Sequence, residues 1–234
     1  MFTVQAIAQM EGVDENGKTR IVIIPGLAVR SYAEDAADDL RSRGYDVSLP
    51  PAPAWRGVPK LLKSYGSQLA GRLDRAGNDI DLLIGLSVGT QAAAVTAVQS
   101  GTVRRLLLIS PMVDPADRTP GRLLGAWLFR KQEGDHGFSA QIPDWRRAGI
   151  PRILAGFLSA LDVRLEEVLP AFDGQLTIVQ PERNTLSSAA FAEQLARRNN
   201  ARFILMPGAA HSWPVGDSSR FADLVDELTG KEPS

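Results

Sequence analysis

The chain has 234 residues, 44% hydrophobic and 23% charged, so one globular domain with a sizeable core is expected. Its formal net charge of −1 argues against nucleic acid or an anionic membrane as a partner. The absence of cysteine excludes disulfides, thiolate metal sites and cysteine nucleophiles. Because His136 and His211 are the only histidines, a zinc site is a poor candidate, and we expect no metal.

The N-terminal segment carries no recognisable secretory signal, because no basic stretch there precedes an apolar core. No apolar run in the sequence reaches the length that spans a bilayer. Residues 3–10 alternate loosely and predict an edge strand. The simplest expectation is a cytoplasmic protein.

Short apolar runs alternate with amphipathic segments along most of the chain. Residues 20–24 form a β-branched run that ends at Pro25-Gly26, which is typical of a strand buried on both faces. Further strands are predicted at 45–49, 80–84, 105–109, 175–179 and 202–206, and helices at 31–43, 59–76, 88–100, 187–198 and 218–229. This alternation predicts an α/β fold with a mostly parallel, doubly wound sheet.

One stretch interrupts the alternation, from Asp114 to Phe172. It contains no clear strand but has helical segments around 121–131 and 151–169, and an insertion of this length predicts a helical cap. We therefore expect a core of residues 1–113 and 173–234 and a cap of residues 114–172. An apolar pocket beneath the cap would be lined by tryptophans, for which the candidates are Trp55, Trp127, Trp145 and Trp213. His136 is expected to be an exposed cap residue.

Residues 85–89 read Gly-Leu-Ser-Val-Gly and fit the G-x-S-x-G pattern. A predicted strand leads directly into this motif and a helix rich in small residues follows it, which is the setting of a nucleophile elbow. Bulky side chains two residues before or after Ser87 would clash in so tight a turn, and glycine stands at both positions. The motif predicts that Ser87 is a nucleophile.

A serine hydroxyl needs a base, and His211 is the candidate. It follows the predicted strand 202–206, on a loop at the same edge of the sheet as the elbow. Backbone amides should stabilise the oxyanion, for which we expect Val88 N–H and a second donor from the loop after residues 20–24. Leu27 is the first choice for that second donor and Ala28 the second.

These features together resemble the α/β-hydrolase superfamily over nearly the whole chain. The resemblance is carried by Ile-Pro-Gly-Leu (24–27), Leu-Arg-Ser-Arg-Gly-Tyr-Asp-Val (40–47), Gly-Leu-Ser-Val-Gly, Ser110-Pro111 and Gly-Ala-Ala-His (208–211). It implies a mostly parallel sheet of eight strands, a Ser–His–acid triad and no cofactor. The superfamily includes esterases, lipases, thioesterases, acyltransferases and lactonases, and also members without catalysis.

The acid of the triad departs from the family pattern. Where the family has Asp in a Gly-x-x-Asp sequence, this chain has Asn184 in Pro-Glu-Arg-Asn. Asn184 could orient His211 through its carbonyl oxygen, although exchange of Asp for Asn in a serine triad can cost on the order of 10⁴ in rate. Asp114 could supply the carboxylate instead, and so could Glu182. The sequence leaves these three alternatives open.

The sequence thus predicts a serine hydrolase that cleaves an ester, thioester or lactone of a medium-sized, partly apolar substrate through an acyl-enzyme on Ser87. Asn184 keeps two alternatives open. One is a non-hydrolytic enzyme of the same fold that catalyses acyl transfer, elimination or cyclisation, and the other is a ligand-binding protein without catalysis.

Overall fold

The computed structural model describes residues 17–129, 138–211 and 213–231. In this part of the chain six strands form one sheet in the order β2-β1-β3-β4-β5-β6, and every neighbouring pair is parallel. The strands are β1 (Arg20–Ile24), β2 (Asp46–Ser48), β3 (Leu82–Leu86), β4 (Arg105–Ile109), β5 (Gln175–Pro181) and β6 (Arg202–Met206). The predicted edge strand at residues 3–10, and His136, lie outside the described residues.

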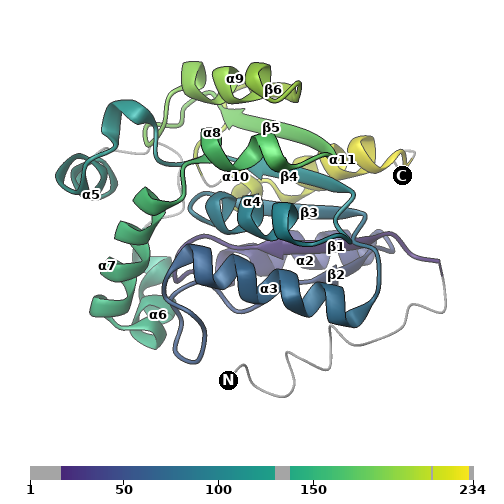
Figure 1. Cartoon of the computed structure of the whole chain (residues 1–234), viewed down its shortest axis with the longest axis horizontal. Helices are drawn as coiled ribbons and strands as arrows, with labels where there is room; N and C mark the ends of the chain where they lie inside the picture. Colours follow the sequence, from purple (N-terminus) through teal and green to yellow (C-terminus); the bar gives the residue numbers. More distant parts are fainter. Residues whose placement is uncertain (1–16, 130–137, 212, 232–234) are drawn as a thin grey trace.

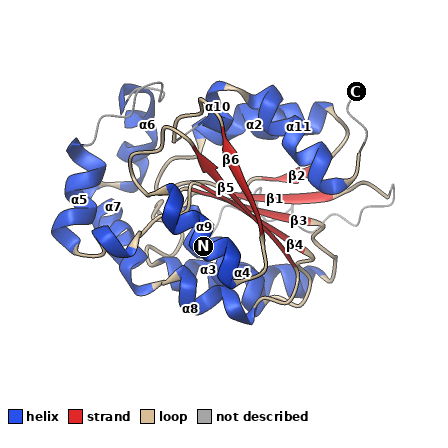
Figure 2. Cartoon of the chain, turned by 90° about the horizontal axis from the view of Figure 1, so that it is seen from above, coloured by secondary structure: helices blue, strands red, loops and turns tan. Residues whose placement is uncertain are grey.

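Helices cover both faces of this sheet, so the α/β prediction is confirmed (Figure 2). One face carries α2 (Ser31–Ser42), α10 (Trp213–Gly216) and α11 (Ser218–Thr229), and the other carries α3 (Leu62–Ala76), α4 (Gly89–Gln99), α8 (Leu165–Val168) and α9 (Ala189–Arg198). Strand β1 shows why its sequence is continuously apolar. Ile21 and Ile23 pack against the first set of helices, whereas Val22 and Ile24 pack against the second.

The boundaries of β3 differ from the prediction in a way that matters for the site. The strand begins at Leu82 and continues to Leu86. Ile80, the predicted first residue, instead makes an isolated bridge to Val103. Pairing with β4 continues beyond the strand, because the Ser87 N–H donates to the Ile109 carbonyl (2.9 Å). The first two residues of the Gly-Leu-Ser-Val-Gly motif therefore belong to the buried strand.

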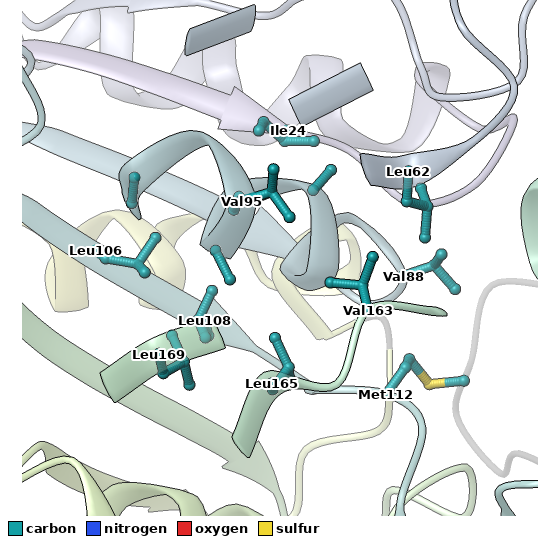
Figure 3. Packing of buried hydrophobic residues seen from close by; sticks show 14 of the residues in the cluster. Ile24, Leu62, Val88, Val95, Leu106, Leu108, Met112, Val163, Leu165 and Leu169 are labelled. Atoms are coloured by element: carbon teal, nitrogen blue, oxygen red, sulfur yellow. The ribbon is translucent and has the colours of Figure 1, made fainter. Parts of the chain in front are cut away.

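Residues 114–172 contain two structurally distinct parts. Helices α5 (Pro120–Phe129), α6 (Phe138–Ala148) and α7 (Ile150–Ser159) gather beyond one end of the sheet (Figures 1 and 2). The helix predicted at 151–169 ends at Ser159, because the chain becomes extended at Val163 and turns into the core. Val163 and Leu165 there join the buried cluster around α4 (Figure 3). The second part thus belongs to the buried core on the α4 side of the sheet.

Helix α6 is attached to the core through one buried carboxylate. Asp144, which is 2% exposed, accepts hydrogen bonds through Oδ2 from Arg30 N (2.9 Å), Ser31 N (2.8 Å) and Ser31 Oγ (2.7 Å). These amides lie at the start of α2, which has no capping side chain of its own. Asp144 therefore caps a core helix from the inserted segment.

Candidate active site

Ser87 lies on a sharp turn between β3 and α4, with a φ of +54°. Non-glycine residues rarely adopt this left-handed conformation, which persists only where surrounding contacts enforce it. Here the Ser87 N–H is held by Ile109, and the Ser87 carbonyl accepts hydrogen bonds from Thr90 N (3.0 Å) and Thr90 Oγ1 (2.6 Å). The turn is thus fixed at both peptide groups of the serine.

The glycines of the motif are required by close packing. A Cβ on Gly85 would lie 2.7 Å from the Ala93 Cβ, and one on Gly89 would lie 2.5 Å from the Pro25 carbonyl oxygen. Both distances are far below ordinary van der Waals contact. The same close approach brings the Pro25 loop after β1 against the start of α4, where the oxyanion donors are expected.

His211 lies on the loop between β6 and α10, as its place in the sequence predicts. Its Nε2 lies 2.7 Å from Ser87 Oγ, which is hydrogen-bond distance. The backbone next to it is tied to the sheet, because the Ser110 hydroxyl donates to the His211 carbonyl (2.8 Å). Ser110 is 1% exposed and follows β4 with a φ of +56°. The sequence shows Ser110-Pro111 after the strand, but no local pattern there indicates this role of the hydroxyl.

Asn184 is the residue that the structure places against the other imidazole nitrogen. Its Oδ1 lies 3.0 Å from His211 Nδ1 and also accepts the Leu186 N–H (2.9 Å), while its Nδ2 donates to Ser187 Oγ (3.1 Å). The Leu186 amide can only donate, so it requires the oxygen of the carboxamide on that side. His211 then carries its proton on Nδ1, and its unprotonated Nε2 accepts the hydrogen bond from Ser87 Oγ.

Asp114 and Glu182, the two other candidates for the acid, make different contacts. Asp114 is 7% exposed and accepts from Ala116 N (3.0 Å), Ser188 N (3.1 Å) and Ser188 Oγ (2.5 Å). In the segment that follows β4, Asp114 thus holds Ser188, the residue that caps α9. Glu182 accepts the Gly208 N–H (2.7 Å). Among the contacts of the described residues, the partner of His211 Nδ1 is Asn184 rather than either carboxylate.

The backbone amides predicted as oxyanion donors differ in whether they already have an acceptor. Neither the Val88 N–H nor the Leu27 N–H has a hydrogen-bond acceptor within the part of the chain that the structure describes. The Ala28 N–H, by contrast, donates to the Pro53 carbonyl (2.9 Å). This occupied amide removes Ala28 as the alternative donor and favours Leu27.

The four tryptophans have different surroundings. The Trp55 indole N–H donates to the Ala28 carbonyl (3.0 Å), so this ring lies beside the Leu27 loop. Trp145 is partly buried on α6, and Trp127 belongs to α5, although its side chain lies outside the description. Trp213, predicted to line the pocket, is 5% exposed and packs edge-on against Phe221 in the core on the α2 and α11 side. The helix α10 that begins at Trp213 turns this ring inward.

Two features are absent from the described ranges, a cluster of metal ligands and a membrane-spanning helix. Within them, no three His, Asp or Glu side chains gather as a metal site. Over the same ranges, no helix combines the length and apolarity that a membrane crossing requires.

Comparison with known proteins agrees with this fold. The sequence matches the model of the alpha/beta hydrolase family over residues 21–224, and the chain belongs to that family. Among curated proteins, no sequence matches the chain.

Solved structures of similar fold span nearly the whole chain. MenH from S. aureus is 15% identical with a TM-score of 0.70, covering 92% of this chain and 95% of that chain. The enol-lactonase from Burkholderia xenovorans LB400 is 15% identical with a TM-score of 0.70, covering 94% of each chain. Bromoperoxidase from Bacillus anthracis is 14% identical with a TM-score of 0.71, covering 92% of this chain and 93% of that chain. At these identities the likeness concerns the fold.

Proposed function

We propose that this chain is a serine hydrolase that cleaves an ester, thioester or lactone through an acyl-enzyme on Ser87. The observation that carries the proposal is the hydrogen-bonded sequence Ser87 Oγ, His211 Nε2, His211 Nδ1 and Asn184 Oδ1. Nucleophile, base and orienting group stand in the relative positions that acyl transfer to serine needs. Membership of the alpha/beta hydrolase family supports an enzyme of the hydrolase kind.

The reaction follows from these contacts. Ser87 Oγ attacks the acyl carbonyl carbon while its proton moves to His211 Nε2, and the Val88 and Leu27 amides stabilise the negative oxygen that forms. Collapse of this intermediate breaks the bond to the leaving group, which takes the proton from His211. Water then attacks the acyl-enzyme with His211 again as base, which releases the acid and restores Ser87.

The acyl group is expected to be medium-sized and partly apolar. Leu27 and Trp55 support this, because both are apolar, only partly buried and situated on or beside the loop with the oxyanion donor. The fold does not choose among substrates, since its structural neighbours include an enol-lactonase and a bromoperoxidase. A cytoplasmic location and a small-molecule substrate stay predictions.

Asn184 favours a second candidate, in which the same site carries out acyl transfer, elimination or cyclisation. A neutral carboxamide orients the imidazole but stabilises the imidazolium less than a carboxylate does. Slow hydrolysis would benefit an enzyme that passes its acyl group to an acceptor other than water. If the site catalysed no reaction at all, the chain would be a ligand-binding protein.

The decisive experiment is covalent labelling with a fluorophosphonate probe, read by intact mass and located by peptide digestion. We expect one adduct, on Ser87, that is lost in Ser87→Ala and strongly slowed in His211→Ala. Hydrolysis of short p-nitrophenyl esters that disappears in Ser87→Ala would support the hydrolase. A folded wild-type protein that neither reacts with the probe nor turns over esters would contradict it.

A further inference from the structure

The peptide groups around the proposed oxyanion donor are fixed by a second loop, residues 52–58. Ala28 is bound to this loop at both ends, because its N–H donates to the Pro53 carbonyl (2.9 Å) and its carbonyl accepts the Trp55 indole N–H (3.0 Å). Ala28 needs such support, since its φ of +56° lies in the left-handed region. The conformation beside Leu27 therefore depends on the position of Trp55.

The direction of the Leu27 N–H follows from a neighbouring hydrogen bond. The Gly26 carbonyl, which shares a peptide group with the Leu27 N–H, accepts the Val29 N–H (3.4 Å). In a trans peptide the carbonyl and the N–H point in opposite directions. The Leu27 N–H thus points away from the short Gly26–Val29 turn and is not used by it.

Loop 52–58 is in turn held by Arg152 of α7. The guanidinium donates through Nε to the Ala54 carbonyl (3.0 Å) and through Nη2 to the carbonyls of Trp55 (2.8 Å) and Val58. Ala54 also has a left-handed φ, of +69°. Three converging carbonyl oxygens repel one another unless a cation lies between them, and the planar fork of arginine suits this arrangement.

Helix α7 also contacts the donor residue directly. A Cβ on Gly156 would lie 2.7 Å from Leu27 Cδ1 and 2.9 Å from the Lys60 carbonyl oxygen, so α7 packs here as closely as a glycine allows. From α6, the Arg147 guanidinium lies 5.5 Å from the Trp55 ring centroid. The inserted helices thus touch the Leu27 loop both directly and through Trp55.

We infer that Trp55 and Arg152 are positioning residues for the Leu27 oxyanion donor, and that through them helix α7 sets the rate of chemistry at Ser87. The inference rests on the proposed function. It gives Trp55 a role in transition-state stabilisation rather than only in lining a pocket. Because a misplaced oxyanion donor weakens binding of the transition state but not of the substrate, the effect should appear in kcat.

Two variants test the positioning role, the first with a small change of side chain and the second with a larger one. Trp55→Phe keeps most of the ring but removes the hydrogen bond to Ala28, and Arg152→Gln removes the cation among the three carbonyls. With a p-nitrophenyl ester, we expect kcat to fall about 10-fold and about 100-fold, respectively, with KM within about threefold. Arg152→Lys should lie between wild type and Arg152→Gln, because lysine keeps the charge but lacks the fork.

Arg146→Gln is the matched control, because Arg146 is exposed on α6, and it should leave kcat unchanged. Inhibition by a trifluoromethyl ketone, whose adduct on Ser87 needs the oxyanion donors, should weaken in proportion to the loss in kcat/KM. A purely structural role would lower Tm while the folded protein kept its kcat.

The possible results distinguish a failure of the positioning role from a failure of the proposed function. Ser87-dependent turnover by the wild type, with unchanged kcat in both Trp55→Phe and Arg152→Gln, would overturn the positioning role alone. A rise in KM at unchanged kcat would do the same, since it would make these residues part of substrate binding. No Ser87-dependent turnover by the wild type would overturn the proposed function and this inference together.

Discussion

The carboxamide oxygen of Asn184 lies 3.0 Å from Nδ1 of His211, and the Leu186 N–H, 2.9 Å away, requires that this atom be oxygen rather than nitrogen. The orientation of the imidazole is therefore fixed as in a Ser–His–Asp triad, but the charge that would stabilise the imidazolium is missing. Asn184 thus orients the imidazole without stabilising its positive charge, whereas the carboxylate of a triad does both.

Asn184→Asp should raise kcat for ester hydrolysis. The new carboxylate can keep the Leu186 and His211 contacts and can accept a hydrogen bond from the Ser187 hydroxyl in place of the one that Asn184 donates. Since loss of the triad charge costs on the order of 10⁴ elsewhere, we expect a gain of at least about tenfold. Initial rates with a p-nitrophenyl ester measure it.

Asn78→Asp is the control, because it adds the same charge between α3 and β3, before the strand that leads to the elbow. It should leave kcat unchanged. A lower kcat in folded Asn184→Asp would show that the neutral amide is what the reaction needs, which would favour chemistry other than hydrolysis.

The Ser110 hydroxyl supports the base from the other side, through the His211 carbonyl. Ser110→Ala removes one buried hydrogen bond, worth roughly 0.5–1.5 kcal/mol, and frees the His211 backbone. We expect kcat to fall by about three- to tenfold with little change in KM. Ser67→Ala also removes a hydroxyl-to-carbonyl hydrogen bond, but on the exposed surface of α3, and should have no effect. Equal kcat in Ser110→Ala and wild type would refute the supporting role.

The elbow requires Gly89 for steric reasons. In Gly89→Ala the new Cβ would meet backbone oxygens of Ile24 and Pro25, which cannot move aside as a flexible side chain can. We expect the free energy of unfolding to fall by about 1–3 kcal/mol, as for other overpacked sites, together with loss of fluorophosphonate labelling. Urea unfolding provides the measurement.

Gly71→Ala is the comparison, because Gly71 lies within α3 and its Cβ would meet only Arg75 Nη1, at 3.4 Å. Alanine is the better helix former there and should stabilise the protein by about 0.5–1 kcal/mol. Similar stability changes in the two variants would contradict the steric explanation.

The sequence predicted the sheet and the Ser87–His211 pair because both depend on local signals. Buried strands are apolar runs whatever surrounds them, and the elbow needs its glycines within five consecutive residues. The choice among Asn184, Asp114 and Glu182 was open because each follows a strand at the same sheet edge. Only the local turn, with the Leu186 N–H bound to Asn184, decides which side chain faces the imidazole.

Contacts between distant segments were beyond prediction for a different reason. The hydrogen bonds among Ala28, Trp55 and Arg152 join the end of a strand, a loop and an inserted helix. No residue spacing in the sequence predicts them. Trp213 lies in a different place from the one that its sequence position indicated. Its closeness in sequence to His211 indicated a pocket wall, but the short helix that begins there buries the ring in the core.

Far from the site, a buried tyrosine links stability to alkaline pH. Burial, reinforced by the hydrogen bond to Asp226 (2.6 Å), raises the pKa of Tyr45 from 10.0 to about 12. Between these values the folded protein retains a proton that the unfolded chain has lost, so stability falls as pH rises. The contribution is fully present below pH 10 and is lost by about pH 12; its size is on the order of 2 kcal/mol.

Tyr45→Phe should therefore flatten the dependence of unfolding free energy on pH between about 10 and 12, although it lowers stability at pH 8 by removing the hydrogen bond. Thr229→Val is the matched control, because it removes the neighbouring hydroxyl (2.8 Å) but leaves Tyr45 to titrate. Burial also raises the pKa of Tyr65, so a residual slope should persist in both variants. Urea unfolding at pH 8, 10 and 11 measures the slopes. If Tyr45→Phe and wild type lost stability in parallel, the Tyr45 contacts would not be the cause.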